Sequence, residues 1–189
     1  MHDSPTVVAL CGSRRDGSHT RTALRHALDA AADAGASTEL VDLDALDLPP
    51  FHPDEETPPA AESLLETVEA ADAVLLGTPV YHGSYSSTLK TALDYCGFDE
   101  FEDTTVGLLA VAGGTAFASA LDHLRVVARS VHAWVLPTQV GVPNVSDAVE
   151  DGAIVDDDVA RRVATLGEET VRYARIEPRP VEAGASADD

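Results

Sequence analysis

Two loops rich in hydroxyl, arginine and glycine residues carry the clearest chemistry of this sequence. The first loop, residues 12–21, reads GSRRDGSHTR and leads into an alanine-rich helical pattern. Backbone amides at a helix start lack intrahelical acceptors and the helix dipole is positive there, so a phosphate fits such a loop. Ser13, Ser18 and Thr20 add hydroxyl donors, and the arginines add a charge that does not titrate away.

The spacing of this first loop excludes two common phosphate motifs. No GKS or GKT follows Gly12, as a Walker A motif requires, and the GxGxxG pattern of dinucleotide folds is absent. A capped helix start with Ser18 as the N-cap is the alternative interpretation, and capping and phosphate binding can share the same atoms. The loop alone does not establish a phosphate site.

The second loop, residues 78–90, reads TPVYHGSYSSTLK and continues into TALDY. A third glycine-containing segment, Gly113-Gly114, follows another apolar run. A tight turn and a close approach to a ligand would both use glycine there. Lys90 and Asp94 are one helical turn apart, which predicts a structural ion pair.

The apolar runs before these loops predict the strands of an α/β fold. The expected strands are Thr6–Cys11, Thr38–Leu43, Ala73–Gly77, Thr105–Ala112 and Ala133–Leu136. Helical spacing predicts helices over 18–35, 60–71, 87–96, 156–175 and a long segment that ends near Ser130. This alternation predicts a parallel sheet covered on both faces, with ligands beyond the carboxyl ends of its strands.

The composition indicates one domain with a strongly acidic surface. The chain has 189 residues, of which 33 are acidic and 12 basic, for a formal net charge of −21. The acids are spread between apolar positions, a composition that resembles proteins of salt-accumulating cells and that would repel nucleic acid. We expect a single domain over 1–176 and a disordered acidic tail over 177–189.

Targeting, membrane and metal features are absent from the sequence. No apolar run is long enough to span a bilayer, and the first residues carry neither a basic nor a hydrophobic signal region, so we expect a cytoplasmic protein without a membrane partner. Cys11 and Cys96 lie far apart, with no CxxC spacing and no histidine cluster. We interpret both as small buried hydrophobic residues and expect no disulfide and no metal site.

Taken together, the two loops resemble the NADPH-dependent FMN reductase family of flavodoxin-like proteins. That family has a Gly-Ser-x-Arg-x-x-Ser-x-Asn loop and a Pro-x-Tyr-x-Gly-Ser loop leading into Leu-Lys-x-x-x-Asp, and the match runs in order through nearly the whole domain. The resemblance implies a flavodoxin-like three-layer α/β sandwich with five parallel strands in the order 2-1-3-4-5. The sequence departs from it at Thr20 and His82, where the family commonly has asparagine, and at Ser86-Ser87, where Pro-Gly is frequent.

The resemblance also implies which residues hold FMN. Those expected around its phosphate are Ser13, Arg15, Ser18 and Thr20. Those expected along its isoalloxazine ring are Pro79, Val80, Tyr81, His82 and Gly83, with the backbone of Gly113 and Gly114 at the pyrimidine end. Ordinary loop packing is the alternative for Tyr81, and simple solvation is the alternative for His82.

The implied activity is hydride transfer from NADPH or NADH to FMN and on to a small-molecule acceptor such as free flavin or a quinone. No catalytic acid or base is assigned, because the cofactor carries this chemistry. The alternatives are a flavodoxin-type electron carrier without nicotinamide-dependent activity, a reductase of azo dyes, chromate or organoarsenicals, and a protein that has lost its flavin. The family also implies a homodimer or homotetramer with the flavin near a subunit boundary, where Phe51 either contacts a neighbouring chain or packs on its own domain.

Overall fold

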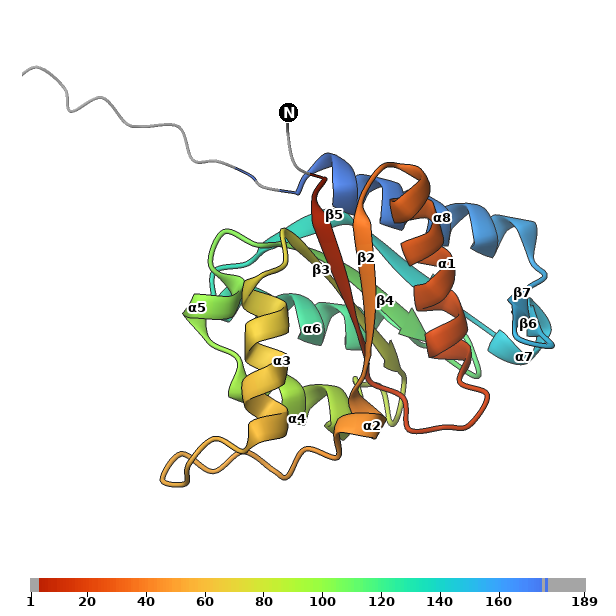
Figure 1. Ribbon diagram of the computed structural model, residues 1–189. Helices are drawn as coiled ribbons and strands as arrows, with labels where there is room; N and C mark the ends of the chain where they lie inside the picture. The colour runs from red at the N-terminus through yellow and green to blue at the C-terminus, as the bar shows by residue number, and fades with distance from the viewer. Residues whose placement is uncertain (1–3, 175, 177–189) are drawn as a thin grey trace, which may run out of the picture.

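Five parallel strands form the centre of the molecule in the order β2-β1-β3-β4-β5 (Figure 1). The computed structural model describes residues 4–174 and residue 176, so the predicted tail at 177–189 lies outside the described residues. The strands are β1 (Thr6–Cys11), β2 (Ser37–Asp42), β3 (Ala73–Pro79), β4 (Thr105–Val111) and β5 (Trp134–Val142). The predicted fold class and strand order are confirmed.

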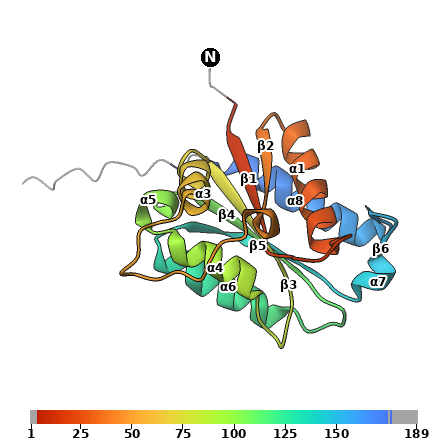
Figure 2. The same cartoon turned by 60° about the horizontal axis from the view of Figure 1, so that its bottom comes forward.

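Helices cover both faces of the sheet and make three layers (Figures 1 and 2). One face carries α1 (His19–Asp33) and α8 (Asp157–Arg172), and the other carries α3 (Pro59–Glu69), α4 (Ser87–Tyr95) and α6 (Ala118–Ser130). Side chains alternate between the faces of a strand, so β1 contributes to both cores. Val8 and Leu10 pack toward α3, α4 and α6, whereas Val7, Ala9 and Cys11 pack toward α1 and α8.

The structure adds short elements that the sequence patterns did not indicate. They are the helices α2 (Leu43–Leu46), α5 (Phe98–Phe101) and α7 (Val145–Ala148) and an antiparallel pair, β6 (Val149–Glu150) and β7 (Ala153–Ile154). Among the helices described, none combines the length and the apolar character that crossing a bilayer requires.

The fifth strand is longer than the predicted Ala133–Leu136 and runs to Val142. Pro137 indicated an end to the strand because proline has no N–H to give to a sheet. In the structure, the pairing of β5 with β4 shifts register opposite Val106 and Leu108, and Pro137 lies within this irregularity. Because β5 is also an edge strand, the missing donor leaves the sheet continuous on either side of the shift.

Both cysteines are buried free thiols, as the sequence predicted. Burial raises the pKa of Cys11, and it raises the pKa of Cys96 to about 12. The Cys96 thiol donates to the carbonyl oxygen of Ala92 at 3.3 Å. Neither thiol has the lowered pKa that a nucleophilic cysteine needs.

Helices α1 and α8 touch at backbone distance because Gly167 has no side chain. A Cβ at position 167 would lie 2.0 Å from the carbonyl oxygen of Ala27. That atom belongs to a buried stretch of α1 and has no freedom to turn aside. The contact therefore sets the spacing of the two helices on this face.

We predict that Gly167→Ala lowers the free energy of unfolding by about 1–3 kcal/mol, because overpacking against backbone outweighs a helix-propensity gain of about 1 kcal/mol. Urea unfolding at fixed salt measures the change. Gly114→Ala is the matched control, since an added Cβ there meets no atom within 4 Å. Equal stability of the two variants would show that α8 moves away without loss.

Candidate functional site

The three predicted loops meet at the carboxyl edge of the sheet, which Figure 2 turns toward the viewer. A cavity of about 240 Å³ opens between them. Its walls are made by Ser13, Arg15, His19, Thr20, Pro79, Val80, Tyr81, Val111, Gly113 and Val145. Parallel α/β sheets bind ligands at this edge because loops and helix starts converge there.

Most of the residues predicted for the site line this cavity. They are Ser13, Arg15, Thr20, Pro79, Val80, Tyr81 and Gly113. Ser18 instead caps α1, and His82, Gly83 and Gly114 are sequence neighbours of the wall without lining it. Three wall residues were missed, of which His19 and Val111 directly adjoin predicted segments. Val145 comes from α7, for which the sequence offered no signal.

The first loop presents polar groups toward the cavity from a helix start. The hydroxyl of Ser18 accepts a hydrogen bond from the amide of Arg21 at 3.1 Å, which confirms the N-cap. Ser13 and Thr20 are only 3 % and 2 % exposed. Both residues line the cavity, as parts of the loop before α1 and of its first turn. Hydroxyl groups at such a helix start can donate to a ligand oxygen.

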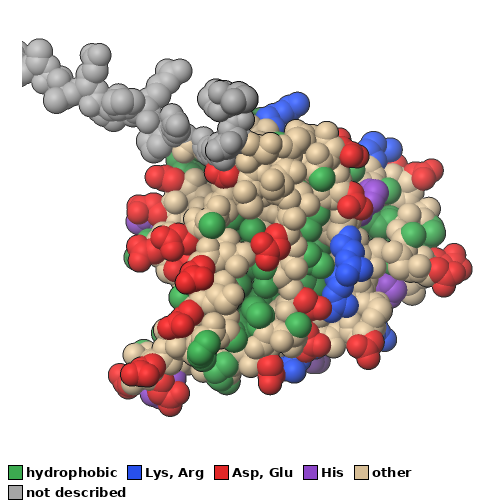
Figure 3. All heavy atoms as spheres, viewed as in Figure 1, with side chains coloured by type: hydrophobic (Ala, Val, Ile, Leu, Met, Phe, Trp, Pro, Cys, Tyr) green, Lys and Arg blue, Asp and Glu red, His purple; other side chains and the backbone are tan. Residues whose placement is uncertain are grey.

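The arginines of this loop differ in what they contact. Arg14 pairs with Asp44 at 2.8 Å, and Arg21 pairs with Asp42 at 2.6 Å. Arg15 lines the cavity, and its guanidinium makes no ion pair or hydrogen bond with any described residue. Acidic side chains are scattered over the face shown in Figure 3. In a chain of net charge −21, an unpaired cation beside a cavity fits a bound anion.

Hydrogen bonds tie the second loop to the first. The hydroxyl of Ser86 donates to the carbonyl oxygen of Gly12 at 2.6 Å, and the amide of Gly12 donates to the carbonyl oxygen of Gly77 at 2.8 Å. Ser86 also caps α4 by accepting from the amide of Leu89. The departure from Pro-Gly at this position therefore supplies a bond between the loops.

The Lys90 ammonium pairs with the carboxylate of Asp94, as the helical spacing predicted. Phe51 is 45 % exposed and packs edge-on against Tyr95, with ring centroids 5.3 Å apart. The Tyr95 hydroxyl donates to the carbonyl oxygen of Pro49. Phe51 is thus held on its own domain while about half of it faces outward.

Packing does not explain the glycines at the start of the third loop. Gly113 and Gly114 have no positive φ, and an added Cβ at either position meets no atom within 4 Å. A turn requires glycine only where φ is positive or where neighbouring atoms leave no room for a Cβ. Free space above Gly113 instead suits a flat ligand that approaches its backbone.

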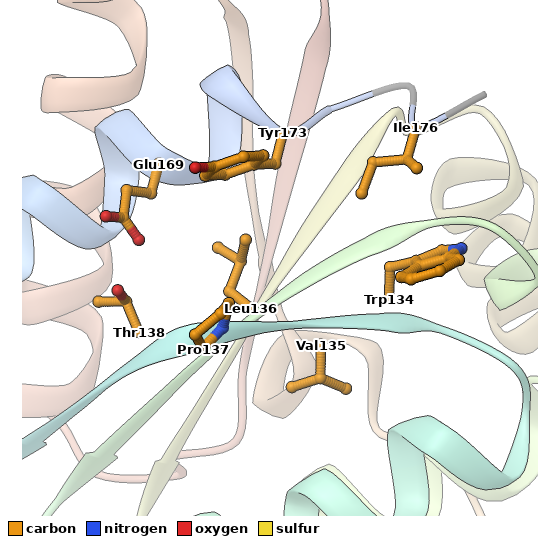
Figure 4. A pocket seen from close by; sticks show the side chains of 8 residues that line it. All are labelled: Trp134, Val135, Leu136, Pro137, Thr138, Glu169, Tyr173 and Ile176. Atoms are coloured by element: carbon orange, nitrogen blue, oxygen red, sulfur yellow. The ribbon is translucent and has the colours of Figure 1, made fainter. Parts of the chain in front are cut away.

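A second hollow, of about 290 Å³, lies on the far side of β5 (Figure 4). Trp134, Leu136 and Pro137 of β5 line one side of it, and Tyr173, the residue that follows α8, lines the other. Trp134 begins β5, so this hollow extends from the amino end of the strand. It contains none of the residues predicted for the site and presents mainly apolar side chains.

Comparison with known proteins identifies the family of the chain. The model of the NADPH-dependent FMN reductase family matches residues 5–147. The chain belongs to this family. The FMN-dependent NADPH-azoreductase of Staphylococcus aureus is 33 % identical to the chain over 178 residues, which cover 89 % of this chain and 95 % of the relative. As a family member, the chain is an NAD(P)H-dependent oxidoreductase that uses FMN.

Solved structures show the same fold. The NAD(P)H:acceptor oxidoreductase FerB of Paracoccus denitrificans is 21 % identical with a TM-score of 0.75, covering 89 % of this chain and 96 % of that one. An NADH:FMN oxidoreductase, EmoB, is 23 % identical with a TM-score of 0.75, and the coverages are 93 % and 92 %. These similarities support the flavodoxin-like architecture.

We predict that Arg15→Ala weakens FMN binding by about 1–2 kcal/mol, roughly 5- to 30-fold, because it removes the unpaired cation from the cavity. Arg14→Ala is the matched control, since that neighbour is paired with Asp44 away from the cavity wall. Flavin fluorescence titration gives both dissociation constants. Equal losses of FMN affinity in the two variants would mean that the net charge of the loop, and not the position of Arg15, determines the affinity.

We also predict that Gly113→Ala leaves the unfolding midpoint of the FMN-free chain unchanged while it weakens FMN binding about tenfold, because the new methyl group enters ligand space. Thermal unfolding and fluorescence titration separate the two effects. A variant with wild-type FMN affinity would show that Gly113 belongs to an ordinary strand-to-helix connection and does not contact the ligand.

Proposed function

We propose that the cavity holds FMN with its phosphate at residues 12–21 and its ring between residues 79–83 and Gly113. The support is the combination of free donors in the first loop with uncrowded glycine in the third. The unpaired Arg15 guanidinium is the single observation that carries most weight, because among the described arginines it alone lines this cavity. Ser13 and Thr20 would complete the contacts to the phosphate oxygens.

The protein groups around the ring mainly bind and orient. Bound FMN supplies the redox chemistry by taking a hydride from reduced nicotinamide and returning two electrons to an acceptor. Pro79 and Val80 give a stiff apolar wall, and the Val80 amide is held by the carbonyl oxygen of Val111 at 2.8 Å. Tyr81, 55 % exposed, supplies an aromatic surface at the mouth of the cavity where a flat substrate can stack.

We infer that the acceptor is a small aromatic molecule, with azo compounds and quinones as the classes to test first. The named activity of the Staphylococcus aureus relative favours azo compounds. The apolar wall and the exposed Tyr81 ring suit planar acceptors better than chromate, a hydrated anion that the acidic surface would repel. A flavodoxin-type electron carrier is the alternative, and an assay of NADPH or NADH oxidation distinguishes it from a reductase.

We predict that the purified protein is yellow, releases FMN and not FAD on denaturation, and decolourises an azo dye with NADPH as the reductant. Cofactor extraction and dye absorbance measure these properties in molar salt. A protein that binds FMN yet does not oxidise NADPH or NADH would be an electron carrier. A colourless protein that takes up no added FMN would overturn the proposal altogether.

We further propose that the working unit is a homodimer or homotetramer and that the protein is adapted to high salt. The large net charge supports the adaptation to salt, because salt screens the repulsion between acidic subunits, and the outward half of the Phe51 ring leaves apolar surface for a neighbouring chain. We predict dimers or larger assemblies in molar salt that dissociate as salt is withdrawn, measured by light scattering. A monomer in molar salt with full NADPH-dependent flavin reduction would refute the assembly.

A further inference from the structure

Residues 81–84 form a two-residue hairpin turn at the edge of the proposed flavin cavity. The amide of Tyr81 donates to the carbonyl oxygen of Ser84, and the amide of Ser84 donates to the carbonyl oxygen of Tyr81, both at 3.0 Å. The two central residues, His82 and Gly83, have φ values of +51° and +78°. This is the backbone of a type I′ turn, for which Asn-Gly is the favoured pair. His82 therefore occupies the left-handed region, which non-glycine residues adopt uncommonly and which asparagine and glycine favour at this kind of turn.

The first and second turns of helix α6 hold this turn from the side. The Ser119 hydroxyl donates to the carbonyl oxygen of Gly83 at 2.5 Å. Nδ1 of His123 lies 3.0 Å from the hydroxyl of Ser84, and the His123 ring packs edge-on against Tyr85 at a centroid distance of 6.4 Å. Positions 119 and 123 are one helical turn apart, so a single face of α6 makes both contacts.

Neither Ser119 nor His123 lines the cavity, yet both act on a turn whose first residue does. Tyr81 is a wall residue, and its backbone amide and carbonyl are both committed to the turn. Helix α6 begins at Ala118, four residues after Gly114, so the segment that supplies the Gly113 wall leads into the helix that holds the turn. A shift of the turn would move the Tyr81 wall relative to Gly113.

We infer that Ser119 and His123 are positioning residues that hold the His82-Gly83 turn in its left-handed conformation and thereby fix the Tyr81 wall beside the flavin. This inference rests on the proposed FMN site. The two side chains supply from α6 the conformational preference that asparagine at position 82 would supply locally. They touch neither the ligand space nor the reacting atoms.

The test is a set of variants assayed for FMN affinity and for NADPH oxidation in molar salt. We expect Ser119→Ala/His123→Ala to raise the FMN dissociation constant about five- to twentyfold, from two lost hydrogen bonds, and to lower kcat/KM for NADPH. Adding His82→Asn should restore most of the affinity, because Asn-Gly favours the turn without help. His123→Asn, which keeps a polar partner for the Ser84 hydroxyl, should remain near wild type.

Ser130→Ala is the matched control, since that hydroxyl lies on the same helix but bonds to Val127 of α6 itself. The inference is overturned if the double variant binds FMN as wild type does, or if His82→Asn fails to restore a lost affinity. If the double variant does not fold, the same comparison of FMN affinity is made for Ser119→Ala with and without His82→Asn. A wild-type chain that binds no FMN would instead refute the proposed function.

Discussion

The ligand edge of this protein depends on the close approach of two loops at Gly12. A Cβ at that residue would lie 2.7 Å from the Cβ of Leu89 and 2.8 Å from the hydroxyl of Ser86. Without it, the end of β1 lies directly against the first turn of α4, and Ser86 bonds both to Gly12 and to the amide of Leu89. The loop before α1, which carries the polar part of the cavity wall, and the loop at residues 79–86 that leads into α4 and carries apolar wall residues are therefore held in one fixed relation.

Much of the fold could be predicted from local sequence patterns, because most strands and long helices carry a recognisable apolar run or periodicity. Apolar runs such as 73–77 are buried on both faces of a parallel sheet, and helical spacing at 19–33 matches one buried stripe. The extension of β5 past Pro137 could not be read locally, because it depends on an edge position and a register shift against β4. A tertiary arrangement made that proline acceptable in a strand.

The candidate site was predicted in part for the same reason. The loops at 12–20 and 79–83 carry their own residue patterns, and most of their predicted residues do line the cavity. Val145 reaches the wall from a four-residue helix, and Ser119 and His123 reach the turn from a helix face that looks ordinary in sequence. The partner of such a residue is distant along the chain, so only the folded arrangement reveals it.

The irregular edge strand also bears on how such a protein avoids self-association through its sheet. Open sheet edges offer unpaired amides and carbonyls to other chains, and molar salt strengthens apolar association while it removes the protection given by charge. Pro137 and the register shift make the edge strand β5 irregular, and Glu39 places a charge in β2 at the opposite edge. The irregular backbone of β5 disfavours pairing with another chain, and salt does not weaken this effect as it weakens the effect of charge.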